Sequence, residues 1–272
     1  MAAIDLYGYA GKRAFVVGGA TGIGAATAKL VGALGAEVVV ADFADIAYDC
    51  AAKIKLDLRD PASIAAAVDA VAAIGPIDAL FSCAGLSQGP DVLNVNCIGQ
   101  RELIEALVNR DLMPRGSAIG MIASGAGLGW ANHVKEITEF ITAPGFDGMQ
   151  KWVEANPTFN NYMFSKEMVV YYCAVRSFDF TKKGIRINAL CPTSTDTPLA
   201  RKSFGWLEYG TDYREAVGID VADPSEQAYP FAFLCSPAAS YISGTLLSVD
   251  NGLQAARATG TFTPAPPTPP SA

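Results

Sequence analysis

A glycine-rich turn between an apolar strand and a small-residue helix constrains the fold of this chain most strongly. The apolar run Ala14–Val17 breaks into Gly18-Gly-Ala-Thr-Gly-Ile-Gly24, and a small-residue helix pattern follows to about Leu34. Gly35 ends that helix, and Glu37–Asp42 is then a nearly continuous apolar run, typical of a strand buried on both faces of a parallel sheet. This stretch predicts a strand, a helix and a second, parallel strand.

The alternation of strand and helix patterns continues along the chain. It predicts an α/β fold, a Rossmann-type doubly wound seven-stranded parallel sheet with helices on both faces. Five further strands are expected at Ile54–Leu56, Asp78–Ala84, Ser117–Ser124, Arg186–Pro192 and Gly244–Asp250, and further helices at Pro61–Ile74, Asn94–Leu107, Tyr162–Lys182 and Pro224–Leu234.

The pattern predicts one domain over residues 1–259, with two departures from the alternation. Residues 125–161 hold several aromatic side chains but no further strand pattern, so they are expected to form an insertion after the fifth strand. Residues 199–217 carry an aromatic load that is unusual for a solvent loop. Residues 260–272 are rich in Pro and Thr and are expected to be an extended or disordered tail.

Composition excludes several classes of protein. Apolar residues make up 51% and charged residues 17%, which supplies a core and excludes disorder of the whole chain. The net charge of −7 has the wrong sign for binding nucleic acid or anionic lipid. The long uncharged stretches Gly116–Val134 and Gln227–Val249 are broken by glycines, prolines or serines, so no membrane span is expected. The start of the chain lacks a secretory pattern, and we expect a cytoplasmic protein.

Cysteine and histidine usage argues against metal and disulfide chemistry. The six cysteines form no Cys-x-x-Cys pair and have no nearby histidine partners. His133 is the sole histidine, so a Ser/His/Asp triad would depend on that residue alone. We expect His133 to be a polar residue on the surface of the insertion.

The glycine turn is suited to a dinucleotide. Missing Cβ atoms at Gly18, Gly22 and Gly24 allow a tight turn and let a pyrophosphate approach the backbone at the start of a helix. Asp42 ends the next strand, about where a carboxylate binds the adenosine ribose hydroxyls. No Lys or Arg occurs between Asp42 and Cys50 to offset repulsion of a 2′-phosphate, so NAD(H) is preferred over NADP(H).

A tyrosine and a lysine lie four residues apart in the longest helix pattern. This spacing places Tyr162 and Lys166 on one helix face. At roughly 5 Å and an effective dielectric constant near 20, the ammonium stabilises a phenolate by about 3 kcal/mol, or about two pKa units. Ser124 ends the fifth strand, at the edge of the sheet where parallel folds bind ligands. The three residues predict a centre for proton transfer.

Taken together, these residues resemble the short-chain dehydrogenase/reductase family over nearly the whole chain, from about Gly11 to Gly252. The resemblance implies hydride transfer between a carbinol carbon and a nicotinamide. It implies that Tyr162 transfers the proton and that Lys166 lowers the pKa of Tyr162. It also implies that Ser124 orients the substrate oxygen and that Asn96 fixes a water. The cofactor residues that it implies are Gly18, Thr21, Gly22, Ile23, Gly24, Asp42, Phe43, Asp57, Leu58, Cys83, Ala84, Gly85, Tyr162, Lys166, Pro192, Thr193, Thr195 and Thr197.

The chain departs from the family most clearly in the spacing between Ser124 and Tyr162. The two are 38 residues apart (162 − 124), where the family typically has about a dozen. With the turn and the Ser236–Tyr241 segment, this insertion is similar to the bacterial 3α-hydroxysteroid dehydrogenase/carbonyl reductase branch. That similarity implies a helical insertion and a homodimer rather than the usual homotetramer.

The segment 199–217 is interpreted as a substrate lid. Its apolar walls favour a bulky hydrophobic secondary alcohol or ketone, such as a steroid, terpenoid or aryl carbinol. The expected substrate contacts are Trp130, Phe204, Trp206 and Leu207. The alternatives are an aromatic mini-core or subunit contact for this segment, and a non-catalytic dinucleotide-binding regulator or interaction protein for the whole chain.

Overall fold

The computed structural model describes residues 7–203 and 205–263. It confirms the predicted Rossmann-type fold, because seven strands form one parallel sheet in the order β3-β2-β1-β4-β5-β6-β7. The strands are β1 (Arg13–Val17), β2 (Glu37–Asp42), β3 (Ala52–Lys55), β4 (Ala79–Ser82), β5 (Ala118–Ile122), β6 (Arg186–Pro192) and β7 (Leu246–Val249).

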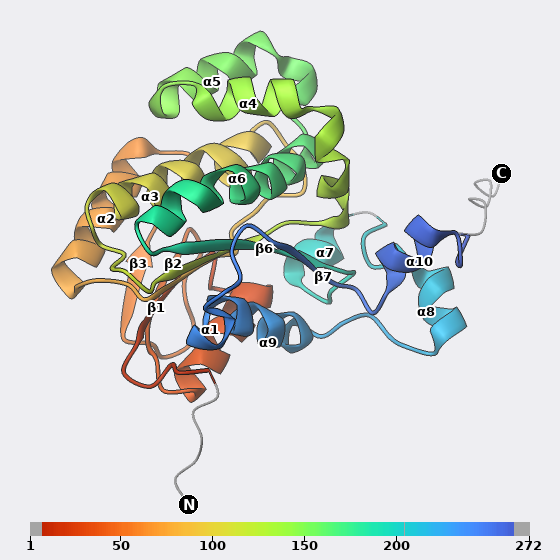
Figure 1. Cartoon of the computed structure of the whole chain (residues 1–272), viewed down its shortest axis with the longest axis horizontal. Coiled ribbons are helices and arrows are strands. Elements are labelled where there is room, and N and C mark those ends of the chain that lie inside the picture. Colours follow the sequence, from red (N-terminus) through yellow and green to blue (C-terminus); the bar gives the residue numbers. More distant parts are fainter. Residues whose placement is uncertain (1–6, 204, 264–272) are drawn as a thin grey trace, which may run out of the picture.

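Helices cover both faces of the sheet (Figure 1). On one face lie α2 (Pro61–Ile74), α3 (Gly99–Asn109) and α6 (Tyr162–Lys182), and on the other α1 (Gly22–Ala33) and α9 (Pro224–Cys235). Local signals explain the ends of these helices. The Asp60 side chain accepts a hydrogen bond from the N–H of Ala62 at 2.9 Å and so caps α2, whose first residue is Pro61.

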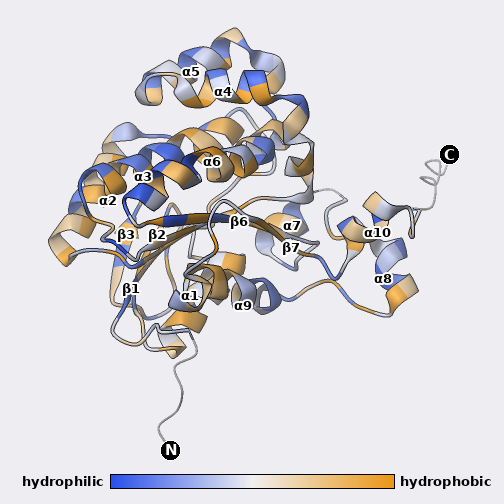
Figure 2. Cartoon of the chain, in the orientation of Figure 1, coloured by the Kyte–Doolittle hydropathy of each residue, from blue (hydrophilic) through white to orange (hydrophobic). Residues whose placement is uncertain are grey.

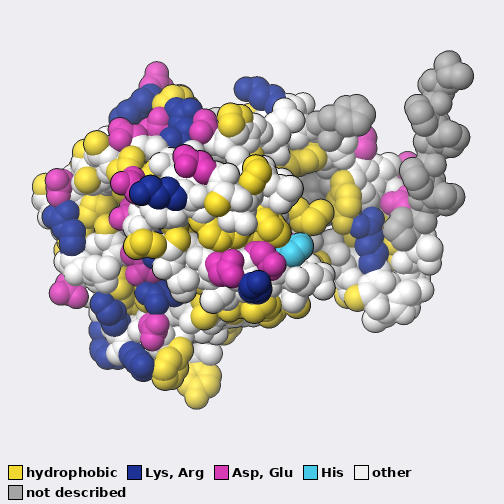
Figure 3. Space-filling view, turned by 90° about the horizontal axis from the view of Figure 1, so that it is seen from above, with side chains coloured by type: hydrophobic (Ala, Val, Ile, Leu, Met, Phe, Trp, Pro, Cys, Tyr) yellow, Lys and Arg dark blue, Asp and Glu magenta, His cyan; other side chains and the backbone are white. Residues whose placement is uncertain are grey.

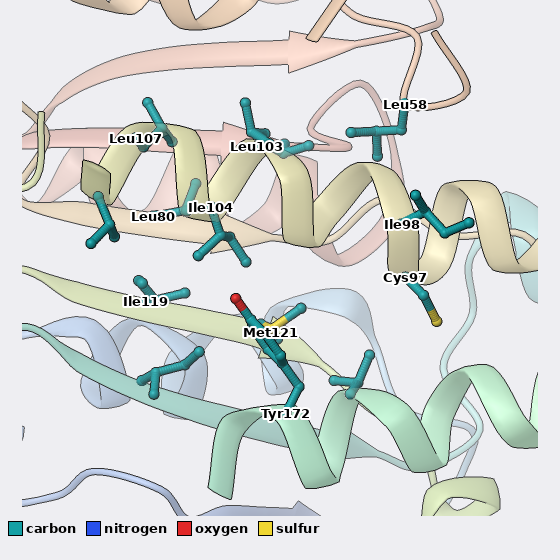
Figure 4. Packing of buried hydrophobic residues seen from close by; sticks show 14 of the residues in the cluster. Leu58, Leu80, Cys97, Ile98, Leu103, Ile104, Leu107, Ile119, Met121 and Tyr172 are labelled. Carbon is teal, nitrogen blue, oxygen red and sulfur yellow. The ribbon is translucent and has the colours of Figure 1, made fainter. Parts of the chain in front are cut away.

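Alternate side chains of each strand enter opposite cores. Phe15 and Val17 of β1 belong to the core under α2, α3 and α6, whereas Ala14 and Val16 belong to the core under α1 and α9. Apolar residues follow the strands, while the surrounding helices are of mixed polarity (Figure 2). In the first core, the labelled leucines and isoleucines of α3 meet those of β4 and β5, and Tyr172 of α6 enters the same layer (Figure 4).

The insertion after β5 is helical, as expected. It comprises η2 (Gly125–Asn132), α4 (Val134–Thr142), α5 (Gly145–Ala155) and η3 (Pro157–Phe159), which add an outer layer above α3 and α6 (Figure 1). Its aromatic residues hold it in place: the Trp152 ring stacks on Phe164 of α6 at 5.6 Å between centroids. Acidic and basic side chains are mixed over the face seen in Figure 3.

After β6 the chain adds a strand and a covering helix to the sheet, and it also forms α8 (Thr211–Val217) and α10 (Leu253–Thr259) beyond the carboxyl edge of the sheet (Figure 1). In chain order, the elements after β6 are α7 (Pro198–Lys202), α8, α9, η4 (Pro237–Ala239), β7 and α10. Most of the Pro-rich tail, residues 264–272, lies outside the described residues. None of the helices in the described ranges has the length and apolarity that crossing a membrane requires.

The short helices α7, α8 and α10 were not predicted, and two predicted elements differ in kind or position. The third strand occupies Ala52–Lys55 rather than Ile54–Leu56, because its pairing with β2 begins at Val39↔Ala52. The helix expected from Asn94 begins as a π-helical turn, η1 (Asn94–Ile98), before α3 continues it. Such turns often accompany functional sites.

Candidate active site

A cleft of about 780 Å³ lies along the carboxyl ends of the strands. The strand order reverses between β1 and β4, where sheets of this kind bind their ligands. Val17, the last residue of β1, lies opposite Ala41 on β2 and Ser82 on β4. The segments that follow these three strands therefore open into one space, with a volume suited to a cofactor and a small substrate.

The glycine turn forms one end of the cleft. A Cβ atom on Gly18, which has a φ of +77°, would lie 2.3 Å from the backbone nitrogen of Ala84, and one on Gly24 would lie 2.1 Å from the oxygen of Gly18. Only glycine fits at either position. In the described part of the chain, no side-chain hydrogen bond from Thr21 caps α1, so its first N–H groups are placed to bind an anion. The turn lines the cleft with Gly18, Thr21, Gly22, Ile23 and Gly24.

Asp42 is fixed at the rim beside this turn. Its Oδ2 atom accepts a hydrogen bond from the N–H of Ala20 and its Oδ1 atom accepts one from the N–H of Ala44, each at 2.8 Å. The carboxylate is therefore oriented before any ligand binds, in a position suited to ribose hydroxyls. The same end of the cleft is lined by Phe43, Asp57 and Leu58.

Folding brings two cations to this rim that the local sequence did not reveal. The Lys55 Nζ atom lies 5.3 Å and the Arg59 Cζ atom 4.9 Å from the centre of the exposed Phe43 ring. Arg59 donates to both carboxylate oxygens of Asp57, at 2.8 and 2.7 Å, which lowers the pKa of Asp57. Lys55 lies 3.4 Å from Asp45. The rim therefore holds positive charge that the 42–50 loop sequence lacks, although both cations already have carboxylate partners.

The end of β4 forms the floor of the cleft. A buried glutamine, which the sequence did not single out, holds it: Gln100 accepts from the Ser82 hydroxyl at 2.7 Å and donates to the Ala84 carbonyl at 2.6 Å. The floor is lined by Cys83, Ala84 and Gly85. The backbone of this segment is therefore rigidly positioned against the glycine turn.

Asn96 lies in η1 and is fully buried. Its Oδ1 atom accepts from the N–H of Leu86 at 2.7 Å, and its Nδ2 atom donates to the Leu86 carbonyl at 2.9 Å and to the Ser165 hydroxyl at 3.0 Å. A Cβ atom on Gly85 would lie 3.4 Å from Asn96 Oδ1 and 4.0 Å from Lys166 Nζ. Asn96 and Lys166 thus approach the same glycine, and Asn96 joins the floor of the cleft to α6.

Ser124, Tyr162 and Lys166 meet in the cleft. Tyr162 is the first residue of α6, and the Asn161 side chain caps the helix at the N–H of residue 164. The Tyr162 hydroxyl forms a hydrogen bond with the Ser124 side chain. The Lys166 Nζ atom donates to the Ile122 carbonyl at 2.8 Å and lies 5.5 Å from the centre of the Tyr162 ring.

Burial dominates the protonation of this pair. Desolvation raises the pKa of Tyr162 to about 12, against a smaller lowering by the hydrogen bond with Ser124. Desolvation lowers the pKa of Lys166 to about 8. The sequence argument predicted the opposite direction for the phenol, because it counted the ammonium charge and omitted the loss of water around both groups. At neutral pH the phenol is a proton donor and the lysine is a cation.

The segment after β6 closes the cleft over the glycine turn. The Thr197 Oγ1 atom accepts from the N–H of Ala200 at 3.1 Å and caps α7. A Cβ atom on Gly22 would lie 3.1 Å from the Thr197 methyl group, so the two segments are in contact. The cleft is lined here by Pro192, Thr193, Thr195 and Thr197.

Aromatic side chains form the open side of the cleft beside Tyr162. The Trp206 ring packs on the Tyr162 ring at 4.8 Å between centroids, with a 53° angle between the ring planes. Leu199, Tyr209 and Gln254 line the same region. Nothing in the local sequence of Gln254 distinguishes it from other polar residues near the end of the chain.

The expected substrate contacts are only partly brought together. Trp206 lines the cleft, but Trp130 does not, because its ring packs against Tyr171 of α6 at 5.7 Å within the insertion. Leu207 is likewise outside the cleft lining, and its carbonyl accepts a hydrogen bond from Arg214 at 2.8 Å. Phe204 lies outside the described residues.

The cysteine, histidine and acidic side chains of the described residues do not converge on a metal site. Across residues 7–203 and 205–263, no three His, Cys, Asp or Glu side chains gather in an arrangement that could hold a metal ion. All six cysteines are free thiols. His133 is at the edge of the insertion, and its Nδ1 atom lies 2.7 Å from a carboxylate oxygen of the buried Glu167.

Two family models match this chain, one on each side of the insertion. Residues 12–129 match the family model described as short chain dehydrogenase, and residues 149–254 match the one described as enoyl-(acyl carrier protein) reductase. The stretch between the two matches falls within the helical insertion.

Characterised relatives match over almost their full length. Cis-4-hydroxycyclohexanecarboxylate dehydrogenase of Sinomonas cyclohexanicum is 31% identical, over 91% of this chain and 98% of the relative. The 3-alpha-hydroxysteroid dehydrogenase/carbonyl reductase of Comamonas testosteroni is 31% identical, over 88% of this chain and 95% of the relative.

A solved structure agrees with the fold. The 3-alpha-hydroxysteroid dehydrogenase from Pseudomonas sp. B-0831, in complex with NADH, has a TM-score of 0.75 and 27% identity, covering 92% of this chain and all of that one. Three findings agree on one family. They are the family models that match on both sides of the insertion, the relatives above 30% identity, and the cleft that contains Ser124, Tyr162 and Lys166. The chain belongs to the short-chain dehydrogenase/reductase family.

Proposed function

We propose that this oxidoreductase interconverts a bulky hydrophobic secondary alcohol and its ketone with NAD(H). The observation that carries the proposal is the meeting of Ser124, Tyr162 and Lys166 beneath the aromatic ring of Trp206. Proton-transferring groups and an apolar wall share one cleft, as hydride transfer to a hydrophobic ketone, or from the corresponding alcohol, requires.

The described residues fit a nicotinamide dinucleotide. Gly18 packs against the backbone of Ala84 and Gly22 against the Thr197 methyl group, and both residues have positive φ, so the turn is tight at the start of α1, where a pyrophosphate would approach. Asp42 suits the adenosine ribose and favours NAD(H), since its carboxylate would repel a 2′-phosphate. When bound, the cofactor would accept or donate the hydride.

Residues of the chain itself transfer the proton. During ketone reduction, the Tyr162 hydroxyl donates its proton to the carbonyl oxygen as that oxygen gains negative charge. Ser124 orients the same oxygen, and the Lys166 cation stabilises the tyrosinate left behind. In alcohol oxidation, the Tyr162 oxygen accepts the hydroxyl proton. Asn96 holds the backbone beside Lys166 and acts as a positioning residue.

The substrate class follows from the walls of the cleft. Trp206 and Leu199 are apolar neighbours of the reacting region, which disfavours phosphorylated sugars. Relatives named for cyclohexanecarboxylate, coniferyl alcohol and hydroxysteroid oxidation support a hydroxylated or carbonyl-bearing ring compound.

The proposal includes a homodimer or homotetramer. Tyr229 of α9 is 53% exposed and Tyr241, between η4 and β7, is fully exposed. Exposed aromatic residues are enriched in subunit interfaces. Light scattering should give a mass of at least twice 28.4 kDa, and a monomeric mass would refute this part of the proposal.

A reductase assay tests the proposed activity. The purified chain is mixed with NADH or NADPH and with cyclohexanones, decalones, aryl ketones, steroid ketones and, for comparison, keto-sugar phosphates. We expect NADH oxidation with hydrophobic ketones and at least about tenfold lower kcat/KM with NADPH or with the sugar phosphates. Binding of NADH without reduction of any ketone would instead support a non-catalytic dinucleotide-binding regulator.

A further inference from the structure

The C-terminal helix α10 brings a polar side chain into the substrate end of the cleft. Gln254, in the first turn of α10, lines the cleft together with Ser124 and Tyr162. In Figure 1, α10 lies beside α8, beyond the carboxyl end of β7. The Tyr213 hydroxyl of α8 donates to the Asn251 carbonyl at 3.0 Å, which ties α8 to the turn that precedes α10.

The backbone of Gln254 is anchored to the sheet. Asp250, which follows β7 and is only 8% exposed, accepts from the N–H of Gly252 at 3.0 Å and from the N–H of Gln254 at 2.9 Å. Leu253 is buried beneath the helix. The position of Gln254 is therefore set by the end of β7, because the carboxylate caps the turn that carries it.

The side-chain amide of Gln254 lies over the residue that follows Ser124. A Cβ atom on Gly125 would be 2.7 Å from Gln254 Nε2, so glycine at this position leaves room for the amide. Nε2 donates to the Tyr209 hydroxyl at 3.3 Å, and Arg257 donates to the same hydroxyl. Tyr209 therefore supports the amide from the side of the lid.

This geometry leaves hydrogen-bonding capacity for a ligand. A glutamine amide has two N–H donors and one carbonyl acceptor, and the contact with Tyr209 uses one donor. An apolar substrate group placed against the amide would remove water from it without replacing the lost hydrogen bond. A substrate oxygen placed there would replace it, so the amide discriminates between the two.

We propose that Gln254, supported by Tyr209, binds a second oxygen of the substrate, away from the carbon that exchanges the hydride. The preferred substrates are then ring alcohols or ketones with a further carbonyl or hydroxyl group, rather than plain cyclic hydrocarbons with one oxygen. This inference rests on the proposed function and adds a specificity-determining residue to it.

Two matched pairs of ketones test the proposal. The pairs are 4-hydroxycyclohexanone with 4-methylcyclohexanone, and a decalindione with the corresponding decalone, each reduced with NADH. In the pair with the larger difference in kcat/KM, the wild-type chain should favour the doubly oxygenated member by roughly threefold to tenfold. This factor corresponds to the free energy of one hydrogen bond. In Gln254→Met, which keeps the side-chain length but has no amide, that ratio should fall to about one.

Controls separate specificity from damage. Ala255→Met alters the exposed side of α10 and should keep the wild-type ratio. Gln254→Glu keeps the side-chain shape but loses the N–H donor, so the kcat/KM ratio for the dione pair should fall. This variant provides a second test if Gln254→Met folds poorly. Equal ratios in wild type and in both Gln254 variants would overturn this inference alone. Failure of the wild type to reduce any ketone would overturn the proposed function and this inference with it.

Discussion

The Lys166 ammonium lies 5.5 Å from the centre of the Tyr162 ring and is held there by a 2.8 Å hydrogen bond to the Ile122 carbonyl. The i, i+4 spacing on α6 places both groups on one helix face, and the end of β5 fixes the cation. The pair is thus oriented by backbone elements rather than by mobile side chains, which is the preorganisation that proton transfer needs.

Burial of Lys166 makes stability depend on pH. Its pKa is lowered from 10.5 to about 8, so the native state loses this proton before the unfolded state does. The penalty for burying the cation is complete below about pH 7, and stability rises as the pH increases through 8 toward 10.5. Relative to Lys166→Met, the wild-type free energy of unfolding should increase by about 2 kcal/mol between pH 8 and 9.5. Urea titrations at both pH values measure this; parallel pH curves would show that Lys166 is not the titrating group.

Asp42 should determine the choice between NAD(H) and NADP(H). Asp42→Asn removes the charge that would repel a 2′-phosphate, and its single side-chain oxygen still accepts from one of the N–H groups of Ala20 and Ala44. The ratio of kcat/KM for NADH to that for NADPH should fall roughly tenfold. Asp45→Asn, a fully exposed site in the same loop, removes an equal charge and should change the ratio little. Equal effects of the two variants would assign the preference to net charge.

Trp206 should contribute to substrate binding rather than to cofactor binding. Trp206→Ala removes the ring packed on Tyr162 at 4.8 Å, so kcat/KM for a hydrophobic ketone should fall about tenfold or more. The dissociation constant for NADH, measured by fluorescence, should stay within about twofold. Leu207→Ala is the matched control, because Leu207 is the next residue and lies outside the cleft lining. A Trp206→Ala enzyme with unchanged kcat/KM would remove this residue from the substrate site.

The insertion should be fastened to α6 by the contact between His133 and Glu167. The Glu167 side chain is 2% exposed, and its carboxylate lies 2.7 Å from His133 Nδ1. His133→Ala leaves a buried carboxylate without this partner and should lower the free energy of unfolding by about 2 kcal/mol. His133→Gln can donate a hydrogen bond to the carboxylate and should lose less than half as much in urea titrations at pH 7. Equal losses would mean that ring packing, not the hydrogen bond, holds the insertion.

The sequence predicted the bounds of an element well where capping residues and the hydrophobic pattern indicate the same ends. The helix Tyr162–Lys182 has the ends expected from its pattern, because Asn161 caps it and Gly184 follows it. The third strand was displaced, because a four-residue edge strand has little pattern of its own and its limits are set by pairing with β2.

The site was predictable only where its residues follow strand ends or helix starts. Asp42, Ser124 and Tyr162 could be placed in this way, and the structure brings them to one cleft. Gln254 could not, since its role depends on how Asp250 turns α10 toward the cleft. Trp130 was misplaced for a related reason: an aromatic residue in an insertion can face a ligand or a neighbouring helix, and only packing decides between them.

Turnover by Tyr162→Phe tests the central claim most directly. The variant keeps the ring that packs on Trp206 and removes the hydroxyl that bonds with Ser124, while Tyr171→Phe on the same helix is the control. The claim predicts that ketone reduction with NADH falls by about a thousandfold in Tyr162→Phe, with NADH binding and thermal unfolding close to wild type, and that Tyr171→Phe stays active. Turnover within tenfold of wild type in the Tyr162→Phe enzyme would contradict the assignment of this phenol as the proton donor.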